Sequence, residues 1–223
     1  MIDTATTAGR LLTAALDLAG SKDWAAVTLV DVAEAAGASL AELRAVFTTK
    51  SDVIAALIDA VDAELLRRTP KRAEGQESRD LLFDAVMTRF DLLAPYKRAL
   101  KSIYASGAYG LPLAGKHLAS RYWMLQAAGI AADGASGALR VAGFAVTYAS
   151  VFGVWLEDDD PGLARTMAAL DRRLRRGEQA LTSLDRVLGV YHRLAREGPR
   201  FVRSVLYGSP AAPNRGSGAA DAT

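Results

Sequence analysis

Cysteine is absent from the 223 residues of this chain. Its absence excludes disulfides, thiolate metal sites and cysteine nucleophiles, and it fits a cytoplasmic location. Long apolar runs are also missing. The longest uncharged apolar stretch, residues 141–156, has 16 residues, fewer than the ~20 that a bilayer-spanning helix needs, so it is expected to be a buried helix. The first 18 residues lack a basic flank and a long apolar block, and we expect no signal peptide there.

Motifs of catalysis are missing too. There is no G-x-S-x-G, no phosphate-binding loop and no H-E-x-x-H, and His117 and His192 stand isolated from other reactive side chains. The acidic run 158–160 resembles a metal site only in composition. Asp160 precedes Pro161, the usual order of an N-cap and a first helical residue, so a helix start is the better interpretation. The sequence therefore predicts no enzyme, metal or cofactor.

The residues that are present favour helix nearly throughout. Alanine and leucine recur at spacings of three and four residues, without sustained period-two alternation. This pattern predicts an all-α protein. The expected organisation is a helix-turn-helix domain at 1–68, a helical ligand-binding and dimerisation domain at 78–180, a basic amphipathic helix at 182–207 and a disordered tail at 208–223.

Three helix starts have a clear chemical signature. Thr28, Ser39 and Thr49 are each followed three residues later by an acid, the pattern of a capping box. Gly37 stands where the first of two short helices must end, and glycine tolerates the left-handed conformation used there. Two short helices joined by a glycine-containing turn form a helix-turn-helix, whose second helix enters the major groove of DNA.

Residues 27–39, VTLVDVAEAAGAS, followed by Leu43, Phe47 and Lys50, resemble the DNA-binding domain of TetR-family transcription regulators. This resemblance covers about residues 8–60. It implies that Thr28 and Lys50 contact phosphates and that Ser39, Leu40, Ala41 and Arg44 face the groove. Two positions depart from the family pattern: Arg44 replaces an aromatic residue, and Val46 stands where histidine is common.

A second resemblance covers about residues 80–176. The segments RFDLLAPY at 89–96, LEDDDP at 156–161 and LDRRL at 170–174 are similar to the ubiquinone-biosynthesis lipid-binding proteins that share the TetR fold. In those relatives the helical region holds an isoprenoid lipid and an amphipathic C-terminal helix touches the membrane. The two resemblances imply the same fold and different functions.

Aromatic side chains gather in the second region, where they form either plain core or the lining of an apolar pocket. The predicted pocket residues are Phe83, Met87, Phe90, Tyr104, Tyr122, Trp123, Phe144, Tyr148 and Phe152. The TetR resemblance also implies a dimer built on the helices at about 135–156 and 162–176. Its predicted interface residues are Val151, Trp155, Leu163, Met167 and Leu170.

Charge is divided unevenly along the chain, although the total is only +2. Residues 1–64 carry four basic and ten acidic groups, whereas residues 171–207 carry nine basic and four acidic ones. An acidic domain is unfavourable for DNA, because neutralisation of phosphates supplies most non-specific affinity. The basic residues at 182–207 flank an apolar face that suits either the domain itself or an anionic membrane. That face comprises Leu184, Leu188, Tyr191, Phe201 and Leu206.

Two functions follow from these patterns. The first is a cytoplasmic, ligand-responsive regulator that binds palindromic double-stranded DNA as a homodimer and takes a small apolar effector. The alternative is a lipid- or quinone-binding accessory protein with a non-functional DNA domain and a C-terminal helix peripherally bound at the inner face of the membrane.

Overall fold

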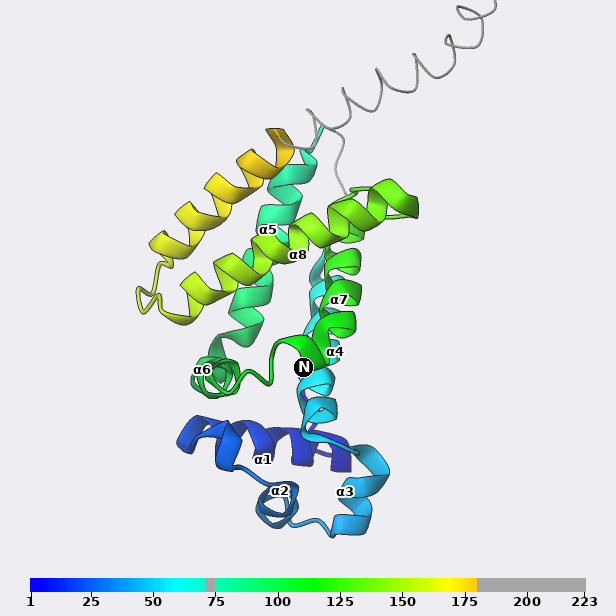
Figure 1. Ribbon diagram of the computed structural model, residues 1–223, viewed down its shortest axis with the longest axis vertical. Coiled ribbons are helices and arrows are strands. Elements are labelled where there is room, and N and C mark those ends of the chain that lie inside the picture. Colours follow the sequence, from blue (N-terminus) through cyan, green and yellow to red (C-terminus); the bar gives the residue numbers. More distant parts are fainter. Residues whose placement is uncertain (71–74, 180–223) are drawn as a thin grey trace, which may run out of the picture. The chain divides into compact units, whose positions relative to one another are not determined.

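The computed structural model describes residues 1–70 and 75–179, and this part of the chain contains helices and no β-strand (Figure 1). The predicted all-α class is therefore confirmed. The α-helices are α1 (Thr7–Ser21), α2 (Leu29–Ala35), α3 (Leu40–Val46), α4 (Lys50–Arg68), α5 (Ser78–Leu93), α6 (Lys97–Ala105), α7 (Ala114–Ala127) and α8 (Gly134–Leu156). The short 3₁₀ turns are η1 (Trp24–Ala26), η2 (Ala94–Tyr96) and η3 (Leu111–Leu113). One more helix begins at residue 164 and runs to the end of the described chain.

All three predicted capping boxes are present. In α3 the Glu42 backbone N–H donates to Ser39 Oγ at 3.2 Å, and Ser39 N–H donates to the Glu42 carboxylate at 2.8 Å. The same reciprocal pair starts α2 and α4. Gly37 has a φ of 61°, the left-handed conformation expected after α2. Helices α2 and α3 have seven residues each and are too short to be stable alone.

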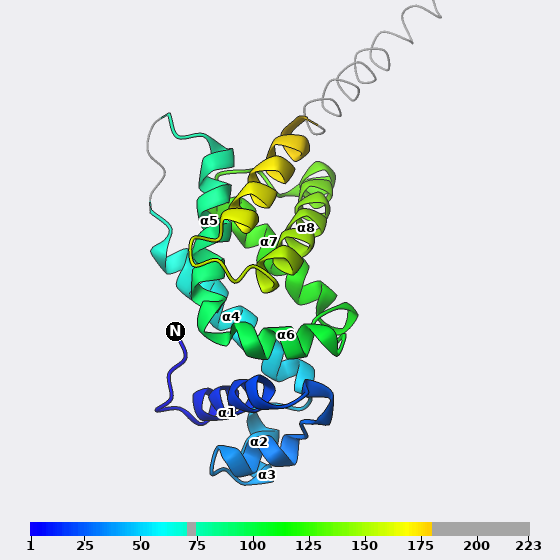
Figure 2. The same ribbon diagram turned by 90° about the vertical axis from the view of Figure 1, so that its left-hand side faces the viewer.

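Helices α1, α2 and α3 pack on one another, α1 also contacts α4, and α4 continues from them into the second group of helices (Figure 2). There α4 packs against α5 and α7, while α6 packs across α1. Buried apolar side chains form one continuous core through both groups. The predicted domains 1–68 and 78–180 thus share a core, and residues 1–178 form one compact unit.

Helix α8 begins and ends within one residue of the range predicted for it, about 135–156. It has 23 residues, includes Arg140, and is long and apolar enough by composition to cross a membrane. A core helix of a soluble protein passes the same test, and one side of α8 packs on the described core through Val141, Phe144 and Tyr148. Leu139 and Val146 are exposed on another side. The expectation of a buried helix is therefore met on one face of α8 only.

The turn after α8 differs from its prediction. Asp160 accepts from the backbone N–H groups of Gly162 and Ala164 at 3.2 and 3.1 Å, and the helix begins at residue 164, two residues later than expected. Asp158 is buried and accepts from both the backbone and the hydroxyl of Thr166. No group of three or more metal-binding side chains occurs in the described residues. The predicted helix at 182–207 and tail at 208–223 lie outside those residues.

Candidate functional site

Helix α3 displays the predicted DNA-facing side chains at the surface. Leu43 is buried and anchors the inner face of α3 in the core. Ser39, Leu40, Ala41 and Arg44 lie on the exposed side. Arg44 donates a hydrogen bond to Thr48 Oγ1 at 3.2 Å, which holds the guanidinium at the C-terminal end of the helix. The geometry of a helix-turn-helix with an outward-facing second helix is present.

Thr28 and Lys50, the two residues predicted to contact phosphates, form hydrogen bonds within the protein. Thr28 is exposed, and its hydroxyl caps α2. Lys50 Nζ donates to the backbone carbonyls of Trp24 and Val27, the latter at 2.7 Å, and lies 4.5 Å from the centre of the Trp24 ring. Burial lowers the pKa of Lys50. Its ammonium group therefore ties α4 to η1, with one of its three donors remaining for a phosphate.

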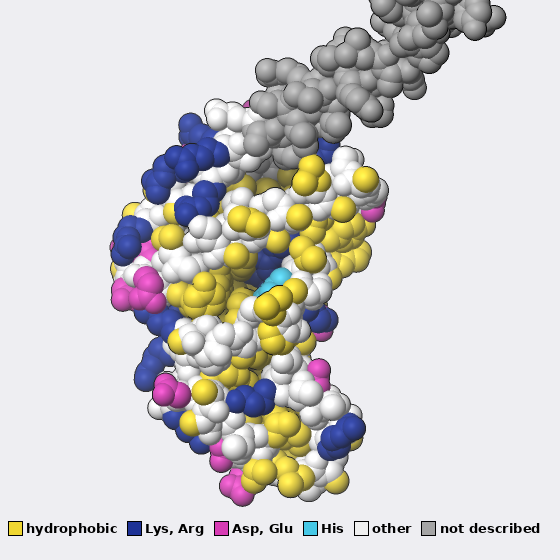
Figure 3. Space-filling view, in the orientation of Figure 1, with side chains coloured by type: hydrophobic (Ala, Val, Ile, Leu, Met, Phe, Trp, Pro, Cys, Tyr) yellow, Lys and Arg dark blue, Asp and Glu magenta, His cyan; other side chains and the backbone are white. Residues whose placement is uncertain are grey.

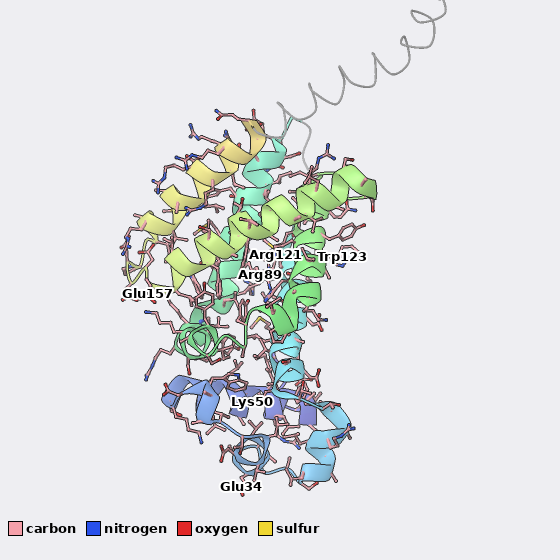
Figure 4. The ribbon with its side chains drawn as sticks, in the orientation of Figure 1. Glu34, Lys50, Arg89, Arg121, Trp123 and Glu157 are labelled. Carbon is pink, nitrogen blue, oxygen red and sulfur yellow. The ribbon has the colours of Figure 1, made fainter. Side chains whose placement is uncertain are left out.

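Three of the ten acidic groups in residues 1–64 form ion pairs with side chains outside that range, so they do not oppose DNA as free charges. The second half of α4 carries Asp59, Asp62 and Glu64, and each pairs with a basic side chain outside residues 1–64. Without these three acids, residues 1–57 still hold seven acidic and four basic groups. Hydrogen bonds from the caps lower the pKa values of Asp31, Glu42 and Asp52, which keeps these carboxylates charged at neutral pH. Glu34 adds an exposed charge on α2 (Figure 4).

Four of the predicted pocket residues come together in a buried aromatic cluster. Phe90 lies 5.5 Å from Tyr148 and 6.4 Å from Phe152 between ring centres. Phe144 contacts Tyr148, and Trp155 stacks on Phe90 at 5.1 Å. Tyr109, which was not predicted, stacks on Phe152 at 5.0 Å. The stripe at 144, 148, 152 and 155 is thus core in this structure.

The other predicted pocket residues lie at its edge or elsewhere. Tyr104 is 49% exposed and touches Phe152 edge-on. Met87 is half-buried against the core, and Phe83 lines a shallow surface groove of about 390 Å³ with Met167. Tyr122 donates to Asp133, and Trp123 is 51% exposed. Trp123 points away from the cluster (Figure 4). Tyr122 and Trp123 therefore do not line the predicted pocket.

Two buried arginines lie beside the aromatic cluster, and neither is among the predicted pocket residues. Arg89 of α5 and Arg121 of α7 are both at most 1% exposed, and Figure 4 shows them close together between α5, α7 and α8. The position of Arg89 in the helical repeat of the sequence indicates that it is buried. Arg89 continues the apolar stripe of Leu82 and Val86, which is where a core residue is expected.

One carboxylate, Asp62, lies beside the two arginines and contacts Arg89 directly. Arg89 pairs with Asp62 of α4 and donates to the Tyr148 hydroxyl at 3.1 Å. Ser120 donates to the same Asp62 oxygen at 2.8 Å, and Arg121 donates to Ser120 at 3.2 Å. The Arg121 guanidinium lies 3.4 Å from the centre of the Tyr148 ring. Two positive charges thus face one negative charge.

Burial lowers the pKa of Arg121. Burial acts in the same direction on Arg89, but Tyr148 and Asp62 offset it and raise the pKa of Arg89 overall. Both side chains stay protonated at neutral pH. Burial raises the pKa of Tyr109 to about 12 and lowers the pKa of His117, so both of these neighbours are uncharged near pH 7. The cluster therefore carries a net positive charge.

The predicted dimer-interface residues lie mostly inside the protomer. Val151, Trp155 and Leu170 are buried in the described core, which leaves them no surface for a second chain. Leu163 is half-buried, with a φ of 50°, and Met167 is 37% exposed. The free apolar surface of α8 instead carries Leu139, Ala142 and Val146.

Comparison with solved structures identifies the arrangement. A TetR transcriptional regulator from Nitrosomonas europaea ATCC 19718 matches with a TM-score of 0.63 at 21% identity, covering 78% of this chain and 99% of its own. One from Rhodococcus sp. RHA1 matches with a TM-score of 0.58 at 23% identity, covering 75% and 93%. A tetR-family transcriptional regulator from Streptomyces coelicolor matches with a TM-score of 0.55 at 20% identity, covering 91% and 100%.

This chain has the TetR fold. The predicted fold is confirmed by these three structures and by the arrangement of α1 to α8. No protein-family model matches the sequence, and no curated protein matches it. At 20–23% identity the likeness concerns the fold.

Proposed function

We propose that this TetR-fold protein is a ligand-responsive transcription regulator that binds palindromic double-stranded DNA as a homodimer. The observation that carries the proposal is α3, a capped helix whose outer side chains, Leu40, Ala41 and Arg44, are free to enter a groove. The matched structures are described as transcriptional regulators. In the described residues, the only side chain of α3 that can donate to a base or a phosphate with a full charge is Arg44.

Helix α4 connects the DNA-facing helix α3 to the second group of helices, where an effector would bind. It begins beside α3 at Lys50 and carries Asp62 at the arginine cluster. Twelve residues of helix correspond to about 18 Å. Ser102 of α6 adds a second link, because its hydroxyl accepts from Trp24 N–H at 2.7 Å and donates to Lys22 O at 3.2 Å. A ligand that favours one setting of α4 and α6 would shift the population of DNA-binding conformations.

The test is binding to genomic DNA fragments over a series of salt concentrations. We expect affinity to fall steeply with salt, as ions are released from phosphates. Arg44→Ala should weaken binding by about 1–3 kcal/mol if Arg44 contacts a base. The matched control is Arg172→Ala, on the exposed side of the helix that begins at 164. Absence of binding at low salt would contradict the proposal.

One observation favours the alternative, a lipid- or quinone-binding accessory protein. The helix-turn-helix region stays acidic after its paired carboxylates are set aside, and Lys50 is held by backbone carbonyls. If the alternative holds, the protein sediments with anionic liposomes, and deletion of residues 182–207 abolishes that sedimentation. Mass spectrometry of the purified protein adds a direct readout, because a bound isoprenoid supports this alternative.

A further inference from the structure

We propose that Arg89 and Arg121 form the anion-binding end of the effector site and that the effector is an apolar monocarboxylate. Its carboxylate would lie between the two guanidinium groups, and its apolar body would lie along the Tyr148 and Phe152 rings. This inference rests on the proposed function, since it specifies the chemistry of the effector.

The first support is a set of unused donors. Arg89 Nη2, Arg121 Nε and Arg121 Nη1 are buried and have no hydrogen-bond partner among the described residues. Buried polar groups are nearly always hydrogen-bonded, and each exception needs an explanation. Three unpartnered donors on two adjacent guanidinium groups suit the oxygens of one carboxylate.

The second support is the charge. Asp62 compensates Arg89, whereas Arg121 faces a tyrosine ring and a serine hydroxyl. A cation over an aromatic ring recovers only part of the free energy that removal of an ion from water costs. One further negative charge would neutralise the cluster. A monoanion supplies that charge, and a neutral ligand does not.

The third support is that packing alone explains Arg121 poorly. A protein with a buried ion that lacks a full partner is usually less stable than the same protein with an apolar side chain of similar volume there. Buried charged groups with perturbed pKa values are enriched at functional sites. Arg121 would then be retained for binding, at a cost in stability.

The environment also fits an apolar body. Tyr148 and Phe152 stack with ring centres 6.0 Å apart, and Phe144 extends the same face of α8. Tyr109 covers Phe152 from the turn between α6 and α7. Its ring centre lies 4.6 Å from that of His117, and its carbonyl lies 2.6 Å from His117 Nε2. Figure 3 shows the surface hollowed between α6, α7 and α8, with a basic side chain at its floor and the described histidine at its edge.

The site has a built-in connection to α4. A ligand carboxylate on Arg89 Nη2 would share the charge of the guanidinium whose Nη1 pairs with Asp62 of α4. It would weaken the Asp62 contact, which is one polar tie between α4 and the helices α5 and α7. Binding of the effector would therefore alter the position of α4, the helix that begins beside α3.

The experiment is calorimetric titration of the full chain, without DNA, with two matched pairs of probes. Octanoate is compared with 1-octanol, and phenylacetate with 2-phenylethanol. We expect the carboxylate of at least one pair to bind at least tenfold more tightly than its alcohol. The pair that binds distinguishes an aliphatic from an aromatic body, and inorganic phosphate should bind at least tenfold more weakly than the preferred carboxylate.

Arg121→Met tests the residue. We expect it to fold, with unchanged or higher thermal stability, and to lose the preference for carboxylate, while Arg98→Met on the exposed surface of α6 keeps it. Equal binding of acid and alcohol, binding of neither carboxylate, or an unchanged preference in Arg121→Met would overturn the inference. Because no DNA is present, these outcomes are separate from failure of the DNA-binding proposal.

Discussion

At the scale of single residues, the two buried arginines differ in how their charge is balanced. Arg89 has a carboxylate partner in Asp62 and a hydroxyl partner in Tyr148. Arg121 has a ring face and one serine hydroxyl. Loss of a partner from a buried ion pair leaves an uncompensated charge, which costs more than loss of both charges together.

This difference leads to a prediction for Asp62→Ala. The substitution leaves Arg89 buried without its carboxylate, and we expect a loss of about 3–5 kcal/mol in the free energy of unfolding. The measurement is urea denaturation followed by circular dichroism. The double variant Asp62→Ala with Arg89→Met should recover part of that loss, because no isolated charge remains. A single variant as stable as the parent would show that Asp62 does not compensate Arg89.

At the scale of the secondary-structure element, the short helices depend on their caps. Helix α3 has seven residues, too few to be stable in isolation. Its Ser39 hydroxyl accepts from Glu42 N–H, and the Glu42 carboxylate accepts from Ser39 N–H. The position of α3 is therefore set locally by this box and by the burial of Leu43.

For Ser39→Ala we expect about 1 kcal/mol of lost stability, the usual cost of removing an N-cap side chain. DNA affinity should fall with it, since the first turn of α3 frays where Leu40 and Ala41 are displayed. Urea denaturation and a DNA titration measure the two effects. Ser136→Ala is the matched control, because Ser136 lies exposed in α8 rather than at a cap. Unchanged stability would mean that the capping bond contributes nothing.

The same local signals explain which elements the sequence predicts well. Thr28, Ser39 and Thr49 start their helices as expected, because a capping box depends only on residues three apart. The helix after Pro161 was placed two residues early. There Asp160 caps a turn and Asp158 bonds Thr166 eight positions away, a tertiary contact that local spacing does not encode.

The candidate site was predicted only in part for a similar reason. The exposed position of Leu40, Ala41 and Arg44 follows from the periodicity of one helix. The arginine cluster requires α4, α5, α7 and α8 together, and the partner of Arg89 is 27 residues away. Tyr104 and Trp123 were assigned to the pocket by residue type, whereas their helices turn them outward.

At the scale of the whole molecule, the proposed dimer needs an apolar surface that the protomer leaves free. The exposed side of α8 provides one, with Leu139 and Val146 52% and 73% exposed. The exposed residues Ala142 and Gly143 between them are small, which lets two helix backbones approach closely. A two-fold contact places each such residue near its own copy, so one substitution acts twice.

We therefore expect Val146→Glu to shift the protein from dimer to monomer, because it places two carboxylates in one apolar contact. Analytical ultracentrifugation measures the change in mass. Leu111→Glu is the matched control: Leu111 is 90% exposed but lies in η3, away from α8, and its substitution should leave the mass unaltered. A dimer that survives Val146→Glu would place the contact elsewhere. A parent protein that is monomeric at micromolar concentration would remove the basis for two recognition helices on one palindrome.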